Sequence, residues 1–515
     1  MGIFFSSKLL NIIASDYLIF TFIFFTLSLV GILHHELWLD EAHHWLLARD
    51  STSFSNLIIN TRYEGHPILW NILLYFISRF SLNPFWMQLL HIIISSLAVF
   101  IFFKNAPFSR LFKIFFIFGY FMFFEYNLLS RNYSLGVLFL FLACCIYSSR
   151  KEKFLLFAIV LTIANNTHAI FIVITTCLLF TVLMEGIQKN GFQISKKTGF
   201  GLTIFVLGTL LAVIQIIPPT DTTFFQRIDD LSMLQKIPKS LITFFKGVFF
   251  IPDFRTIHFW NTHLIVNLNK SVAAILGILS FFIPYLLFYK NRIVLTYTYL
   301  AIIGTGVFFF ITQLSAPRYF GINYLIIISG LWMNHYHTFT KNRFNSLLSK
   351  ISVDGVKNVI IYSILTIQLI SGILAYSIEI AKPFTSSKQV ITFLNKHNLS
   401  HKVIATVACD GTALSSYLER PVFFTNSNKY QSYCIWGDPI INTSLSKESI
   451  IESLQGLLNT LDETLIFISY QPIFNINSGD DWKIIDEKIK YKFLKSFEES
   501  IINKGDYYIY EVSKK

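Results

Sequence analysis

The chain has 515 residues, of which 53% are hydrophobic and only 14% are charged. Soluble domains carry about 25% charged residues, so this composition excludes an ordinary soluble protein. The formal net charge of +12 would suit a nucleic-acid-binding protein. Most of the basic residues, however, lie in short loops between apolar runs, as the positive-inside bias of membrane proteins predicts. The sequence therefore predicts a polytopic membrane protein with a lipid bilayer, and no nucleic acid, as its partner.

A transmembrane helix needs about 20 consecutive apolar residues, within a range of about 17–25. The first apolar run, residues 17–35, ends in His34-His35-Glu36 instead of a small-residue cleavage site, which indicates a retained span rather than a cleaved signal. The sequence therefore predicts a mostly α-helical membrane domain over residues 1–381, with about 11 spans in all. The later spans are expected at residues 86–103, 111–127, 132–149, 153–166, 168–184, 199–217, 269–289, 293–313, 317–334 and 358–380.

Residues 68–80 are apolar, but the run is only about 13 residues long, which suits a juxtamembrane helix better than a span. If this helix does not cross the bilayer, the loops rich in Lys and Arg all fall on one side, as the positive-inside bias requires. The N-terminus is then cytoplasmic. Two large loops, residues 36–85 and 218–268, are then external, and the second contains a predicted interfacial helix over residues 238–251.

From about residue 382 the composition becomes that of a soluble domain, so residues 382–515 are expected to form a small external α/β domain. Cys409 and Cys434 lie in this domain and would be able to pair if it lies outside the cytoplasm; the sequence leaves this open. Helical spacing covers residues 387–399 and 446–461, and short strands are expected at residues 402–409, 421–425, 464–469 and 507–512.

Asp40 and Glu41 stand side by side directly after the first span. Transfer of a sugar from a phosphate carrier to an alcohol needs a base for the acceptor proton and cations for the departing phosphate. A carboxylate at the membrane boundary suits the first role, because the tail of the carrier can stay in lipid. The alternative is structural: Asp40 would be the N-cap of a helix over residues 41–50, with Glu41 favourable in its first turn. The two roles are compatible.

Several histidines lie near this acid pair. His43 and His44 follow it on the same predicted helix, but their spacing lacks the i, i+4 pair and general base of a helical zinc site. Interfacial histidines are therefore the default interpretation for both. His66 lies in a Gly65-His66-Pro67 turn that begins the next helix, near a helix N-terminus that favours an anion. For His66, phosphate binding and simple turn formation are both open.

Other charged residues lie at predicted external membrane boundaries. Glu125 ends the third predicted span and Arg131 follows it. Charged groups beside a membrane are costly unless they are paired or used, so a mutual ion pair or a substrate role would explain them. Arg318 begins the tenth span, where its guanidinium fork suits a phosphate group, although a snorkelling interfacial side chain is the alternative. His168, at another such boundary, is interpreted as interfacial.

Four motifs in this order resemble the GT-C superfamily of membrane glycosyltransferases, and within it the protein O-mannosyltransferase-like and aminoarabinose-transferase-like branches. The resemblance covers roughly residues 15–335. Many members of the superfamily have a second proline where this chain has Ile68, and some have Asp where it has Glu125. The motifs are Leu39-Asp40-Glu41-Ala42, Glu64-Gly65-His66-Pro67-Ile68-Leu69-Trp70, Ser130-Arg131-Asn132-Tyr133-Ser134-Leu135 and Pro317-Arg318-Tyr319.

The resemblance implies a polyprenyl-phosphate sugar donor, an external active site and inversion at the sugar carbon. It implies that Asp40 is the catalytic base and that Glu125 positions the acceptor or a metal; Glu41 is the third catalytic candidate. Some members use a divalent cation and others do not, and Asp40 and Glu125 are the candidate ligands if one binds here. The candidate groups for holding the donor phosphate are Arg131, Arg318, His66, Tyr133 and Tyr319.

We therefore expect a hexosyl- or pentosyltransferase of the cell inner (plasma) membrane that acts in the synthesis of a cell-envelope glycan. Its acceptor would be a lipid, a glycan or a protein. The alternatives are a transporter or flippase of lipid-linked glycans, and a glycan polymerase or ligase. Transporters often show inverted repeats and broken helices near the bilayer midplane, and the sequence shows neither.

Overall fold

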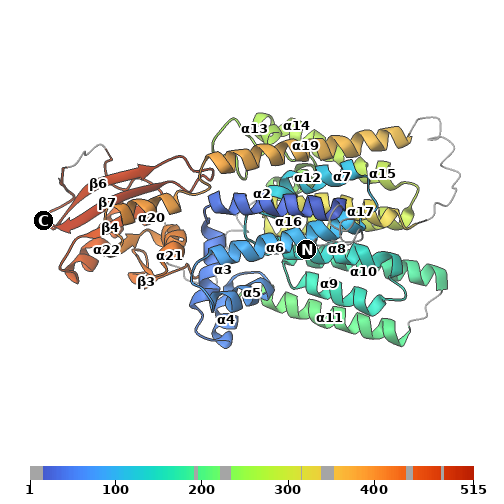
Figure 1. Cartoon of the computed structure of the whole chain (residues 1–515), viewed down its shortest axis with the longest axis horizontal. Helices are drawn as coiled ribbons and strands as arrows, with labels where there is room; N and C mark the ends of the chain where they lie inside the picture. The colour runs from blue at the N-terminus through green and yellow to red at the C-terminus, as the bar shows by residue number, and fades with distance from the viewer. Residues whose placement is uncertain are drawn as a thin grey trace, which may run out of the picture.

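The computed structural model describes residues 15–190, 195–220, 233–314, 316–337, 353–436, 445–476 and 481–515. The molecule is elongated: a bundle of helices runs along its long axis, and a domain with a β-sheet lies at one end (Figure 1). The helices of residues 39–78 lie at the same end of the bundle, next to the sheet domain (Figure 1). The helices thus make up most of the described chain, and a small sheet lies in its C-terminal part.

By length and composition, 7 of the described helices are able to cross a membrane. The chain is therefore a polytopic membrane protein of mostly helical fold. In α14–α15 a break at Phe281 separates two shorter helices that together make one such segment. The seven are α2 (Asp16–His34), α6 (Phe85–Asn105), α10 (Ala169–Asn190), α11 (Lys196–Ile216), α14 and α15 (Lys270–Ser280 and Phe282–Phe288), α16 (Arg292–Thr312) and α19 (Val353–Ala381).

The other four predicted spans are helical but short or polar. The stretch predicted over residues 111–127 is divided into α7 (Arg110–Ile117) and the π-helix η2 (Tyr120–Glu125). The helix α17 (Pro317–Asn334) is almost wholly buried in the bundle and carries Arg318 and Asn323 on its buried surface. Sequence hydropathy cannot tell such a packed core helix from a lipid-facing one. The remaining two are α8 (Tyr133–Ile146), continued by η3 (Tyr147–Ser149), and α9 (Phe154–Asn165).

The segment after α2 folds back over the end of the bundle. It forms α3 (Leu39–Asp50), α4 (Phe54–Asn60), η1 (Thr61–Tyr63) and α5 (Leu69–Ser78), and α3 packs against α5. The helix α5 has 10 residues, too few to cross a bilayer, in agreement with the juxtamembrane helix expected there. The N-cap of α3 is Trp38 and not Asp40, so the capping role considered for Asp40 is wrong. Asp40 lies inside the first turn, where its side chain is free to face a cavity.

In the second large loop, α12 (Met233–Val248) begins before the predicted helix and packs against α14, α16 and α17. The short helix α13 (Leu264–Leu268) follows it. Phe244 and Val248 of α12 are buried in the bundle. This helix is therefore part of the packed core of the bundle. Residues 221–232 of the same loop lie outside the described part of the chain.

The C-terminal domain has a seven-stranded sheet with the order β3-β2-β1-β4-β7-β6-β5. The strand β1 pairs in parallel with β2 and β4, and the other neighbours are antiparallel. The alternating side chains of β4 point to two cores, with Leu465 and Phe467 on the α22 side and Ile466 and Ile468 on the α20 side. The elements are α20 (Ser387–Lys396), β1 (Ile404–Thr406), η5 (Ala408–Gly411), α21 (Thr412–Leu418), β2 (Val422–Phe424), β3 (Lys429–Gln431), α22 (Lys447–Asn459), β4 (Leu465–Ser469), β5 (Lys483–Ile484), β6 (Ile489–Phe497) and β7 (Tyr507–Lys514).

Both predicted helices and all four predicted strands of this domain are present. The sequence pattern did not predict α21, β3, β5 or β6. The strand β6 is the longest of the sheet, but four lysines or serines interrupt its apolar pattern, and it contains a register shift between Phe493 and Lys495. Cys409 and Cys434, whose pairing the sequence left open, form a disulfide, with 5.6 Å between their Cα atoms.

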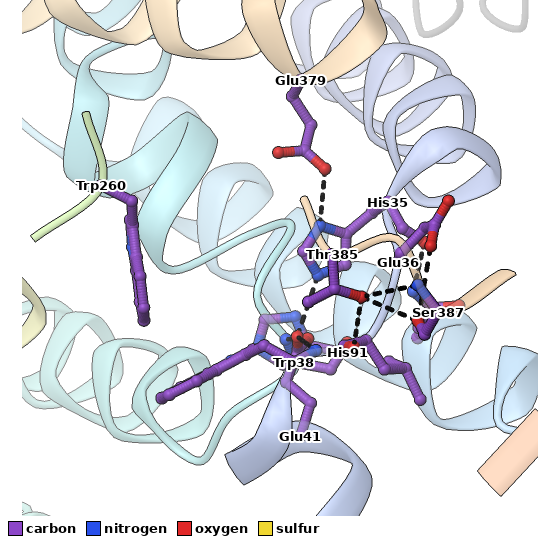
Figure 2. Close-up of polar contacts among 12 residues, drawn as sticks. His35, Glu36, Trp38, Glu41, His91, Trp260, Glu379, Thr385 and Ser387 are labelled. Carbon is purple, nitrogen blue, oxygen red and sulfur yellow. Dashed lines mark hydrogen bonds and ion pairs between the residues drawn. The ribbon is translucent and has the colours of Figure 1, made fainter. Parts of the chain in front are cut away.

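Hydrogen bonds join this domain to the end of α2 and to the segment that follows it. The backbone N–H of Leu37 donates to the Tyr417 hydroxyl at 2.9 Å, and the Thr385 hydroxyl donates to the Leu37 carbonyl at 3.0 Å. The Glu36 carboxylate accepts the backbone N–H of Lys388 at 2.7 Å, and Figure 2 shows Glu36 beside Thr385 and Ser387. The C-terminal domain thus fixes the start of the segment that carries Asp40.

A close helix contact in the bundle gives a direct test of this packing. A Cβ added at Gly247 of α12 would clash with the backbone carbonyl oxygen of Phe320 in α17. We expect Gly247→Ala to lower the unfolding free energy by about 1–3 kcal/mol, as overpacking of a core does. Thermal unfolding of the protein in detergent micelles measures the effect. The control is Gly306→Ala in α16, where an added Cβ meets nothing within 4 Å; equal melting temperatures for the two variants would contradict the contact.

Candidate functional site

A cavity of about 360 Å³ lies where α3, the turn before α5, and the ends of α11, α16 and α17 meet. This volume falls in the range of about 300–1,000 Å³ that small-molecule sites occupy. Apolar side chains line part of the wall, among them Ile216, Phe308 and Leu314. The polar and charged lining groups are Asp40, His43, His44, Tyr63, Glu64, His66, Arg131, His168, Thr312, Arg318 and Tyr319.

Asp40 faces two guanidinium groups in this cavity. Its Oδ2 lies 3.1 Å from Nη1 of Arg131 and 3.5 Å from Nη2 of Arg318. The side chain of Asp40 is 24% exposed, whereas those of Arg131 and Arg318 are 4% and 11% exposed. One carboxylate thus partners two buried cations, which leaves a net positive charge among these three side chains. Such an arrangement favours an anion in the cavity.

Aromatic rings hold both guanidinium groups in place. The Arg318 guanidinium lies 4.9 Å from the ring of Trp38, 5.6 Å from that of Trp260 and 4.9 Å from that of Tyr319. The Arg131 guanidinium lies 6.0 Å from the Trp38 ring. Stacked guanidinium groups lose little freedom when they bind a ligand, since the planar fork is already oriented.

Glu125 does not line the cavity but hydrogen-bonds to Trp260, one of the aromatic residues that pack on Arg318. Its Oε2 accepts hydrogen bonds from the Tyr120 hydroxyl at 3.0 Å and from Trp260 Nε1 at 3.2 Å. Its other oxygen is buried without a hydrogen-bond partner. The ion pair considered between Glu125 and Arg131 is absent, because Arg131 pairs with Asp40.

His66 lies beside the two arginines in the cavity. Arg131 Nη2 donates to His66 Nε2 at 3.5 Å, which leaves the proton of a neutral His66 ring on Nδ1. Burial, and then the charges of Arg131 and Arg318, lower the pKa of His66 to about 3. Nδ1 is buried and has no partner in the described structure. His66 is therefore an unpartnered neutral donor beside two cations and not a third cation.

The two tyrosines named for phosphate binding lie close to each other, but only Tyr319 lines the cavity. Their ring centroids are 6.1 Å apart, and the Tyr133 ring lies 4.7 Å from that of His168. The Tyr133 hydroxyl is buried in the described structure. His168 also lies 4.5 Å from the ring of His66, so it belongs to the cavity wall and is not the interfacial residue expected from its position.

His43 and His44 both turn toward Glu64. His43 Nε2 donates to Glu64 at 2.6 Å, and His44 Nε2 lies 3.9 Å from the second carboxylate oxygen. Both histidines are buried, so the interfacial interpretation of them is wrong. Among the described residues, no three His, Cys, Asp or Glu side chains are grouped to hold a metal ion. Asp40 and Glu125, the ligands considered for a cation, differ in that only Asp40 lines the cavity.

Glu41, the neighbour of Asp40, points away from the cavity into a buried network. Figure 2 shows His35 between Glu41 and Glu379: Nε2 of His35 lies 2.9 Å from Glu41 and Nδ1 lies 2.8 Å from Glu379. Glu41 also accepts the backbone N–H of Trp38 at 3.2 Å and that of Ser130. It thereby joins the first turn of α3 to the residue before Arg131. Glu41 is a positioning residue, and a direct contact of Glu41 with substrate, as its place beside Asp40 suggested, does not fit this geometry.

Several groups of the site carry no sequence signal that would have revealed them. Glu379 lies 344 positions from His35, and Trp260 lies 135 positions from Glu125. Trp436, in the C-terminal domain, lines the cavity although nothing in its sequence context indicates this. For Glu379 the sequence contains one indication: it is an acid within an apolar helix, where a charged side chain is costly unless it is paired.

Comparison of the chain with protein-family models and with curated proteins finds no match. The functional interpretation therefore depends on the geometry of the cavity. Four of the groups expected to act together, Asp40, His66, Arg131 and Arg318, line one cavity at the end of the bundle.

The His35 network predicts how stability changes with pH. Burial disfavours the His35 cation, but the charges of Glu41 and Glu379 outweigh burial and raise the pKa of His35 from 6.5 to about 10. A raised pKa stabilises the fold fully below pH 6.5, and this contribution is lost as the pH rises through about 10. We expect the melting temperature to fall over this interval, and to fall less steeply in His35→Gln. Scanning fluorimetry of both proteins across the interval tests this; parallel pH profiles would contradict it.

Proposed function

We propose that this chain is a membrane-embedded glycosyltransferase that moves a sugar from a polyprenyl-phosphate donor to an acceptor hydroxyl. The observation that carries the proposal is the Asp40 carboxylate facing the buried Arg131 and Arg318 in a cavity walled partly by the ends of apolar helices. The cations suit the donor phosphate, the carboxylate suits the acceptor proton, and the apolar wall suits the first prenyl units.

The reaction balances with the groups of the cavity alone. The acceptor oxygen attacks the anomeric carbon of the sugar, on the face opposite the phosphate, and the bond from that carbon to the phosphate oxygen breaks. The bonding electrons leave with the oxygen, giving polyprenyl phosphate with one more negative charge. Asp40 takes the acceptor proton. The products are an inverted glycoside, polyprenyl phosphate and a protonated Asp40.

The pairing of Asp40 with both arginines suggests how donor and base act in order. The phosphodiester of the donor carries one negative charge, as a carboxylate does, and offers two free oxygens to the guanidinium groups, so it would compete with Asp40 for them. Each hydrogen bond that the arginines give to phosphate would weaken their hold on Asp40, which makes its carboxylate a stronger base. The Nδ1–H of His66, which has no partner in the described structure, would supply a further donor to the phosphate.

In this proposal the chain has about 11 spans. Its N-terminus lies in the cytoplasm, and the cavity lies on the external side of the cell inner membrane. The Cys409–Cys434 disulfide supports an external C-terminal domain, because disulfides persist in oxidising compartments. In this proposal the chain is a member of the GT-C superfamily, and a cation, if the reaction needs one, binds at Asp40.

Substitution of the base tests the proposal directly. We expect Asp40→Asn to lower the rate of sugar transfer by about 10²–10⁴-fold, the usual contribution of a general base. The assay follows release of polyprenyl phosphate from a radiolabelled polyprenyl-phosphate sugar by protein in lipid nanodiscs. Asp16→Asn, an exposed acid at the other end of α2, is the matched control. Full transfer by a correctly folded Asp40→Asn protein would remove Asp40 from the mechanism, and movement of intact donor across vesicles would indicate a transporter.

The phosphate-binding role of Arg318 has a separate test. Arg318→Lys keeps the positive charge but loses the guanidinium fork and its stacking on Trp38 and Trp260. We expect the KM for the donor to rise by about tenfold or more, as the loss of one charged hydrogen bond implies, with a smaller change in the KM for the acceptor. The control is Arg292→Lys, an exposed arginine at the other end of α16. An unchanged donor KM would contradict the role.

A further inference from the structure

One short segment of the C-terminal domain, residues 432–436, reaches the cavity. The side chain of Trp436 lines the cavity, and its ring lies 5.4 Å from that of His43. The Tyr433 ring also lies 5.4 Å from that of His43, at 90° to it. The Ser432 hydroxyl donates to the carboxylate of Asp50 at the end of α3. The segment therefore follows α3 along the part of the helix that faces the cavity.

The middle of this segment is covalently fixed. Cys434 is fully buried in the core between the sheet and α20, and its disulfide to Cys409 joins it to η5. Trp436 follows this buried, disulfide-bonded cysteine by two residues. Trp436 is thus presented to the cavity by the folded C-terminal domain.

The cavity has two kinds of wall. Ile216, Phe308 and Leu314, at the ends of the apolar helices α11 and α16, offer an apolar surface. The wall around Trp436 is aromatic and polar: His43 donates to Glu64 at 2.6 Å, and Glu64 is within reach of His44 as well. An aromatic face beside a few fixed hydrogen-bonding groups is the lining that suits a polar ring with an apolar face.

The helix α3 relates this wall to Asp40. Residues three and four apart lie on the same face of a helix, so Asp40, His43 and His44 share one face of α3. One turn of helix rises about 5.4 Å, which is close to the width of one sugar ring. A ring placed against His43 and Trp436 would therefore bring a hydroxyl at its edge to the Asp40 carboxylate.

We propose that the acceptor is a saccharide, and that Trp436 of the C-terminal domain forms its binding subsite together with His43 and Glu64. This inference rests on the proposed function, since it assigns the acceptor side of the same cavity. The sugar ring packs its C–H face on the indole, and its hydroxyls bond to Glu64 and His43. A saccharide offers both an apolar face for the indole and several hydroxyl groups for Glu64 and His43.

Binding of free sugars tests the subsite without requiring turnover. The full-length protein in lipid nanodiscs is incubated with N-acetylglucosamine, chitobiose or maltose, and separately with a peptide rich in Ser and Thr, and contacts are read by saturation-transfer NMR. We expect a saccharide signal from the wild-type protein, loss of it in Trp436→Leu, and its retention in Trp436→Phe. The matched control is Trp482→Leu, a partly exposed tryptophan of the same domain away from the cavity, which should bind like the wild type.

The outcomes separate this inference from the proposed function. An intact Cys409–Cys434 disulfide in each variant, measured by mass spectrometry without reductant, shows that the domain has folded. No saccharide signal from the wild type, an equal signal in Trp436→Leu, or a signal from the peptide alone would overturn the subsite. Consumption of the polyprenyl-phosphate donor is measured independently. Donor turnover with no Trp436-dependent sugar binding would refute the subsite alone. Sugar binding without donor turnover would refute the transferase, and with it the acceptor role of the bound sugar, but it would leave the saccharide site in place.

Discussion

The buried carboxylate of Glu41 is the interaction on which the site depends. It accepts hydrogen bonds from the backbone of Trp38 and of Ser130 and an ion-paired hydrogen bond from His35. These three partners belong to the end of α2, the start of α3 and the loop before α8. A buried charge is tolerated only when its hydrogen-bonding capacity is filled, so all three segments must come together around it. Asp40, which precedes Glu41, and Arg131, which follows Ser130, are placed as a result.

The two neighbouring acids, Asp40 and Glu41, have different partners and different roles in the site. Glu41 is wholly buried and stabilises the fold, whereas Asp40 keeps part of its surface in the cavity and faces Arg131 and Arg318. An i, i+1 pair on a helix points in different directions, which lets adjacent acids serve a core and a cavity at once. The aromatic support of the arginines adds to this, because Trp38 lies at the N-cap of the same helix and touches both.

Sequence reasoning located the main groups of the cavity because membrane boundaries leave strong signals. A charged residue next to an apolar run is costly, so Asp40, Arg131 and Arg318 were conspicuous, and loop charge placed them on one side. The direction of each side chain was not accessible: Glu41 and Glu125 share the same kind of boundary as Asp40 but point into buried networks. Long-range partners such as Glu379 and Trp436 depend on tertiary packing between segments hundreds of residues apart. The number of spans was not accessible either, because α17 is buried in the bundle and sequence hydropathy does not separate such a helix from a lipid-facing one.

The place of Trp436 in the chain has a consequence for biogenesis. Every described helix of the bundle precedes it, so the ribosome has made the complete bundle, with Asp40 and its arginines, well before this part of the cavity wall exists. A nascent or truncated chain would hold the charged groups in an unfinished pocket. The cavity wall is thus completed only when the last domain has folded and its Cys409–Cys434 disulfide has formed.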